Sequence, residues 1–79
     1  MIINNERFVI AKRRKTPEET VQFLADDRYA FYDPTELTSD INDAYKYINE
    51  SLAHDMIGIY GLNKEDFEVR QVNVTYEVV

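Results

Sequence analysis

The most regular alternation of apolar and polar residues lies at the carboxyl end of the chain. Four apolar residues are separated there by single polar ones: Val72, Val74, Tyr76 and Val78. A period of two is typical of a half-buried β-strand. Phe67 and Val69 are out of phase with this series, so a one-residue bulge near Arg70 or Gln71 is expected to restore the faces. We therefore predict a long strand over residues 67–79 whose four alternating apolar side chains face a helix.

The amino-terminal third contains further strand signals and one ambiguous segment. Residues 5–12 include the run Phe-Val-Ile-Ala and end in charges, which predicts a strand. Residues 16–19, Thr-Pro-Glu-Glu, form a capping box that taken alone predicts a short helix. Residues 20–24 are rich in β-formers, and residues 25–28 form a turn into the aromatic stretch 29–32. We favour a hairpin here and keep the helix as the alternative for residues 16–25.

A helical region is expected in the second half, after a loop over residues 33–38 that follows from Pro34. Thr38 or Ser39 supplies a cap for it. Apolar residues then recur at helical spacing and predict one buried face: Ile41, Tyr45, Ile48, Leu52, Met56 and Ile59. Gly61 is placed to end the helix in a Schellman motif, with Leu62 contacting Ile57.

The same pattern also fits an interrupted helix. Asn49 is a good N-cap, which would leave a turn of helix over residues 40–45, an extended link at residues 46–48 and a helix over residues 50–60. The spacing of the apolar residues does not choose between the continuous and the interrupted form.

Composition limits the chain to one small domain, residues 1–79. Seventy-nine residues with 44% hydrophobic content are enough for a single core and too few for two. There is no cysteine, which removes disulfides, thiolate nucleophiles and Cys-ligated metals. The start of the chain lacks the pattern of a secretory signal, and no apolar run approaches the roughly 20 residues that span a bilayer. We expect a soluble, cytoplasmic protein with no membrane contact.

Charge is distributed unevenly along the chain. Net charge is −6, yet residues 1–15 carry five basic residues and one acidic residue. Four of the basic residues are consecutive: Lys12, Arg13, Arg14 and Lys15. This run is the only basis for contact with phosphate or with an acidic partner, because the rest of the chain repels nucleic acid.

Catalytic and cofactor sites find little support in the sequence. His54, the single histidine, has no nucleophile or second ligand at a fixed local spacing, and we expect a surface histidine. The two glycines, Gly58 and Gly61, form no phosphate loop. The carboxylates match no EF-hand spacing, so turn and cap chemistry is preferred to metal binding. We predict a protein without enzymatic activity, cofactor or metal.

One acidic segment with interleaved aromatic residues is the candidate partner-binding surface. Aromatic side chains ringed by polar contacts are the usual anchors of protein interfaces. The candidate residues are Asp26, Asp27, Tyr29, Phe31, Tyr32, Asp33, Glu36, Asp40 and Asp43. Their charge indicates a partner with a basic surface.

The order of these segments resembles that of small uncharacterised proteins encoded by phages and prophages of Gram-positive bacteria. The likeness is carried by residues 7–10 (Arg-Phe-Val-Ile), residues 40–44 (Asp-Ile-Asn-Asp-Ala), Ala53 and residues 72–79. It covers most of the chain, contains no chemical motif and favours the interrupted helix. It also implies a setting in which a small acidic protein acts by occluding a host protein.

Together these observations predict an α+β domain. A small antiparallel sheet, made of the amino-terminal strand, the hairpin and the long carboxyl-terminal strand, packs on one helical segment. The expected function is non-enzymatic binding of a host protein, with inhibition of a defence or nucleic-acid enzyme, in a DNA-mimic form, as the sharper version. The alternatives are a structural homodimer, which the long terminal strand favours, and a nucleic-acid accessory protein that uses residues 12–15.

Overall fold

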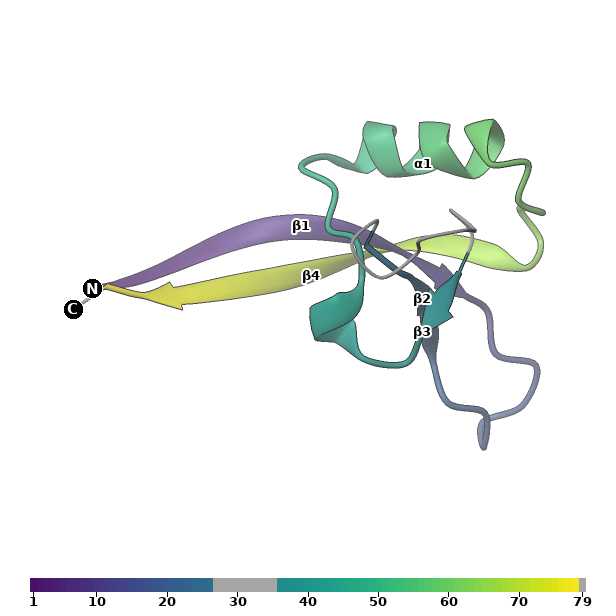
Figure 1. Cartoon of the computed structure of the whole chain (residues 1–79), viewed down its shortest axis with the longest axis horizontal. Helices are drawn as coiled ribbons and strands as arrows, with labels where there is room; N and C mark the ends of the chain where they lie inside the picture. Colours follow the sequence, from purple (N-terminus) through teal and green to yellow (C-terminus); the bar gives the residue numbers. More distant parts are fainter. Residues whose placement is uncertain (27–35, 79) are drawn as a thin grey trace.

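The protein is an α+β domain in which one helix covers part of an antiparallel sheet (Figure 1). The computed structural model describes residues 1–26 and 36–78. The strands are β1 (Ile2–Lys12), β2 (Gln22–Leu24), β3 (Leu37–Thr38) and β4 (Phe67–Glu77). A 3₁₀ turn, η1 (Ile41–Asp43), and the helix α1 (Glu50–Ile59) lie between β3 and β4. This architecture confirms the fold class that the sequence predicts.

The four strands are ordered β3-β2-β1-β4, and every neighbouring pair is antiparallel. β1 is the inner long strand, and Val9, Ile10 and Ala11 at its carboxyl end are fully buried. A continuous apolar run is typical of a strand covered on both faces. β4 lies at the edge of the sheet and pairs only with β1 among the described strands.

The pairing of β1 with β4 corrects the predicted bulge. The register runs without interruption from Ile2 opposite Glu77 to Lys12 opposite Phe67. Phe67 and Val69 therefore keep their phase and pack on the core beside Ile10. Because side chains alternate between faces, Val72 and the later apolar residues of β4 lie on the opposite face. The prediction that they face the helix is wrong.

The helical region takes the interrupted form. Asn49 caps α1 by accepting a hydrogen bond from the Leu52 amide at 2.8 Å. The helix ends in the predicted Schellman motif: Leu62 N–H donates to the Ile57 carbonyl at 3.0 Å, and Gly61 has φ of 67°. Before α1, the chain makes only the short turn η1, whose cap is Asp40 rather than Thr38 or Ser39.

The ambiguous segment over residues 16–25 forms no helix. Its only strand is the short β2, and the second half of the predicted hairpin, residues 29–32, lies outside the described residues. The Glu19 carboxylate does reach back, but it accepts from the Lys15 amide at 2.9 Å and closes a turn. The predicted loop over residues 33–38 is also wrong at its end, because Leu37–Thr38 forms β3 and pairs with β2.

The core is a thin layer between α1 and the sheet. Its buried members come from β1, β2, the link before α1 and α1 itself: Ile10, Leu24, Tyr47, Ala53 and Ile57. The helix contributes only Ala53 and Ile57 as buried residues. The apolar face that the sequence predicts to be buried is divided: Tyr45 and Met56 are half-buried against the core, whereas Ile48, Leu52 and Ile59 are exposed.

Candidate functional site

The predicted acidic and aromatic surface is only partly described. Asp27, Tyr29, Phe31, Tyr32 and Asp33 lie outside the described residues. Four members can be placed: Asp26, Glu36, Asp40 and Asp43.

Backbone hydrogen bonds bring the segments that carry these acidic residues together, and the Asp40 side chain caps a turn. The Asp26 amide donates to the Asp43 carbonyl at 2.8 Å, and the Ala25 amide donates to the Glu36 carbonyl at 2.9 Å. The Asp40 side chain accepts from the Asn42 amide at 2.9 Å and caps η1. Asp40 therefore acts in turn chemistry, as the spacing of the carboxylates indicates.

A lysine closes over the same turn. The Lys46 ammonium donates to the carbonyls of Ile41 at 2.8 Å and Ala44 at 3.0 Å. This contact places a positive charge beside η1, within the acidic segment. The segment is consequently less negative than its carboxylates alone suggest.

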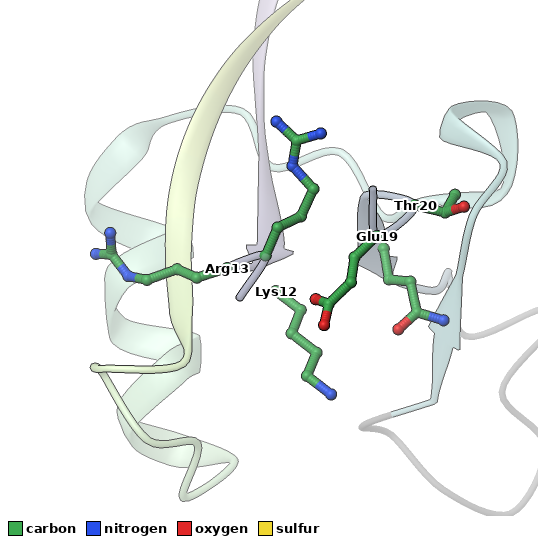
Figure 2. Close-up of a pocket in the computed structure, with 6 residues that line it drawn as sticks. Lys12, Arg13, Glu19 and Thr20 are labelled. Atoms are coloured by element: carbon green, nitrogen blue, oxygen red, sulfur yellow. The ribbon is translucent and has the colours of Figure 1, made fainter. Parts of the chain in front are cut away.

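Three residues of the basic run, Lys12, Arg13 and Arg14, line a shallow hollow together with Glu19, Thr20 and Gln22 (Figure 2). Figure 2 shows Lys12 and Arg13 leaving the chain in different directions, with the Glu19 carboxylate on the Lys12 side. Arg13 pairs with Glu68 at 3.1 Å, and Arg14 donates to the Pro17 carbonyl at 3.4 Å. Side chains that diverge and already have acceptors form a poor phosphate site.

His54 lies on the exposed surface of α1, where its Nε2 is 3.4 Å from Glu50 Oε1 one turn earlier. The sequence predicts a surface histidine, and the exposed position confirms it. Across residues 1–26 and 36–78, no group of three or more His, Asp or Glu side chains is arranged to hold a metal ion. In the same residues, no helix has the length and apolar character needed to cross a membrane.

The most exposed apolar surface of the helical region is the α1 stripe, which we define as Ile48, Leu52, Met56 and Ile59. Ile48 precedes the cap of α1, and the other three lie at positions i, i+4 and i+7 on one flank. Ile48 is 70% exposed, Leu52 is 45% exposed and Ile59 is 71% exposed. Isolated exposed apolar residues are common, but an aligned set is typical of an interaction surface.

A tyrosine-lined hollow of about 270 Å³ continues the α1 stripe toward the sheet. It is lined by Tyr45, Tyr47, Leu52, Met56 and Tyr60. The rings of Tyr45 and Tyr47 are in contact, with centroids 4.5 Å apart. Such a contact holds two aromatic side chains in place, so less side-chain entropy is lost when a partner binds.

Sequence reasoning placed the α1 stripe in the core and so missed it as a surface. One signal was available. Ala53 and Ile57 form a second apolar pair at i, i+4, displaced around the helix from Leu52 and Ile59. A helix covered by a sheet on one side buries only one flank, so two apolar flanks indicate that one of them is left exposed.

The arrangement therefore offers an apolar and aromatic surface on one flank of α1. In comparisons with known proteins, no family model matches this chain, and neither the curated proteins nor the solved structures searched show a match to it.

Proposed function

We propose that this chain is a small, non-enzymatic protein-binding domain that holds a basic partner through the α1 stripe and the adjoining tyrosine hollow. The observation that carries the proposal is the exposure of Ile48, Leu52 and Ile59 beside a preformed aromatic hollow. When a partner covers such a surface, apolar area is removed from water, and this contributes favourably to the free energy of binding.

Burial of the exposed α1 stripe alone is too small to hold a partner, so binding also needs the tyrosine hollow and complementary charge. Covering the exposed fractions of Ile48, Leu52 and Ile59 removes the equivalent of about two apolar side chains from water, about 3–6 kcal/mol gross. Association alone costs about 4–15 kcal/mol. The stripe therefore needs further contacts, which the tyrosines and complementary charge supply.

The negative charge of the chain favours a partner with a basic surface. Net charge is −6, and the exposed Asp55 neighbours Leu52 and Ile59 at helical spacing. A carboxylate beside an apolar surface, in a chain with a negative net charge, suits a partner with apolar anchors and Lys or Arg next to them. Under the resemblance to phage and prophage proteins, this partner is a host protein, and binding inhibits it by covering its surface.

Two variants, whose substituted isoleucines are each similarly exposed, test this proposal. A chain with Ile48→Ser and Ile59→Ser is compared with the control Ile2→Ser, since Ile2 is 66% exposed on the distant end of β1. Each is used as bait in bacterial lysate, and captured proteins are quantified by mass spectrometry. We expect a basic protein that the wild type and the control capture equally and the double variant captures about tenfold less, corresponding to about 1.4 kcal/mol. Equal capture by the double variant, with its fold verified by circular dichroism, would overturn the proposal.

A further inference from the structure

The outer edge of β4 is the longest stretch of unpaired strand backbone in the described part of the chain. β4 has 11 residues, about twice the usual strand length, and β1 is its only described neighbour. Figure 1 shows β1 and β4 running side by side into a two-stranded arm that carries both termini. We define the arm as residues 1–6 and 73–78. A two-stranded ribbon alone is marginally stable in water, so a third strand would stabilise it.

Hydrogen bonds at the ends of the β1–β4 pair show which backbone groups point outward. Met1 and Val78 exchange two bonds, with the Val78 amide donating to Met1 at 2.6 Å and the Met1 amine donating to Val78 at 2.8 Å. The Arg13 amide donates to Asp66 in the same register. In an antiparallel pair, hydrogen-bonded residues alternate along each strand. The even-numbered residues of β4 therefore bond to β1, and the odd-numbered residues direct their N–H and C=O groups outward.

β4 carries three charged side chains, Glu68, Arg70 and Glu77, but it lacks the lysine, proline and bulge that natural proteins commonly place on a strand edge. Residues 67–78 contain no lysine and no proline, and the continuous register excludes a bulge. Natural proteins use these devices to stop an edge from pairing with another chain. Instead, the two sides of the arm differ: the odd-numbered residues 71–77 of β4 are polar, and the even-numbered residues 72–78 are apolar. Tyr76 is 55% exposed and Val78 is 46% exposed.

We propose that β4 pairs antiparallel with β4 of a second copy of this chain, with Val74 on the twofold axis. Within residues 71–77 this register places like beside like on both faces, and just outside this range Arg70 lies opposite the partner's Val78. Val74 lies opposite the partner's Val74, Val72 opposite the partner's Tyr76, Asn73 opposite the partner's Thr75, and Gln71 opposite the partner's Glu77. The odd-numbered pairs exchange about eight hydrogen bonds, and the even-numbered pairs bring apolar side chains into cross-strand contact. The two sheets become one continuous sheet.

Neighbouring registers are less favourable. A twofold axis at Arg70 sets two guanidinium groups opposite each other, which is repulsive. An axis at Asn73 sets Val69 against the partner's Glu77, and an axis at Thr75 matches polarity but loses one exchanged pair. The Val74 register matches polarity at every pair within residues 71–77 and exchanges one more hydrogen-bonded pair than the Thr75 register. A second copy is the occupant that this edge fits, because its own residue sequence is self-complementary.

The cysteine-free chain allows a direct test of the axis. In this register the two Val74 residues form a non-hydrogen-bonded pair with Cα atoms about 4.5 Å apart, which is within reach of a disulfide. The two Val72 residues are four residue steps apart, about 14 Å, and are out of reach. We expect Val74→Cys to form a disulfide-linked dimer under mild oxidation in at least tenfold higher yield than Val72→Cys or Tyr76→Cys.

Sedimentation of the unmodified chain provides the second measurement. The expected mass at 500 μM is twice the 9.3 kDa of the monomer. Asn73→Pro removes an outward N–H without touching a β1 hydrogen bond, so it should give a folded monomer. A monomer mass for the wild type at 500 μM, or equal cross-linking of the Val72→Cys and Val74→Cys variants, would overturn the proposal. The α1 stripe is untouched by these changes, so the test is separate from that of partner binding.

Discussion

The clearest test of how α1 packs is a pair of identical substitutions two residues apart. Ile57 is 3% exposed and belongs to the core, whereas Ile59 is 71% exposed. Replacing a buried isoleucine by alanine costs about 2–5 kcal/mol, because it removes apolar contacts and leaves a cavity. The same change at Ile59 removes few contacts and slightly improves helix propensity, so its cost should lie within about 0.5 kcal/mol of zero.

Urea denaturation followed by far-ultraviolet circular dichroism measures both costs. For a domain of this size, 1 kcal/mol shifts the urea midpoint by about 1 M and the melting temperature by about 4–8 °C. Since a core this small supplies only about 3–5 kcal/mol, Ile57→Ala is expected to be largely unfolded. The milder pair, Ile57→Val and Ile59→Val, then carries the comparison, with an expected cost of about 0.5–1.5 kcal/mol at Ile57 only. An Ile59 variant as costly as the corresponding Ile57 variant would refute this packing, since Ile59 would then be buried as the sequence pattern predicts.

Three further measurements examine the ends and the exposed flank of α1. Gly58→Ala should raise the free energy of unfolding by about 0.5–1 kcal/mol, because an added Cβ meets nothing within 4 Å. Gly61→Ala should lower it by about 1 kcal/mol, because φ is 67° at that position. Equal shifts of the melting temperature in the two variants would contradict this pair of predictions. Asn49→Ala should cost about 1 kcal/mol by removing the cap on the Leu52 amide, and an unchanged urea midpoint would show that the cap contributes nothing. His54→Gln should leave stability and partner capture unchanged, and loss of capture by the folded variant would assign the histidine a role in binding.

Local interactions were readable from the sequence. The N-cap at Asn49 and the helix end at Gly61 depend on residues within five positions of each other. The same is true of the Asp40 cap on η1, although the sequence favoured Thr38 or Ser39 for this role. Strand type and approximate position were also determined locally for β1 and β4, because a run of β-formers or a period of two is sufficient to indicate a strand.

Faces and partners were decided only by the tertiary structure. The alternation of apolar and polar residues in β4 is the same whether Phe67 or Val72 faces the helix. Because β4 pairs with β1 without interruption, Phe67 is on the side of the core and Val72 is on the opposite face. On α1, two apolar flanks compete for one sheet, and the small residue Ala53 allows close approach, so the flank with Ala53 and Ile57 is buried and the one with Leu52 and Ile59 is left to solvent. Hydrophobicity along a chain tells which residues favour burial, but which of them are buried depends on contacts between segments far apart in sequence, and for this protein that difference created the surface proposed to bind a partner.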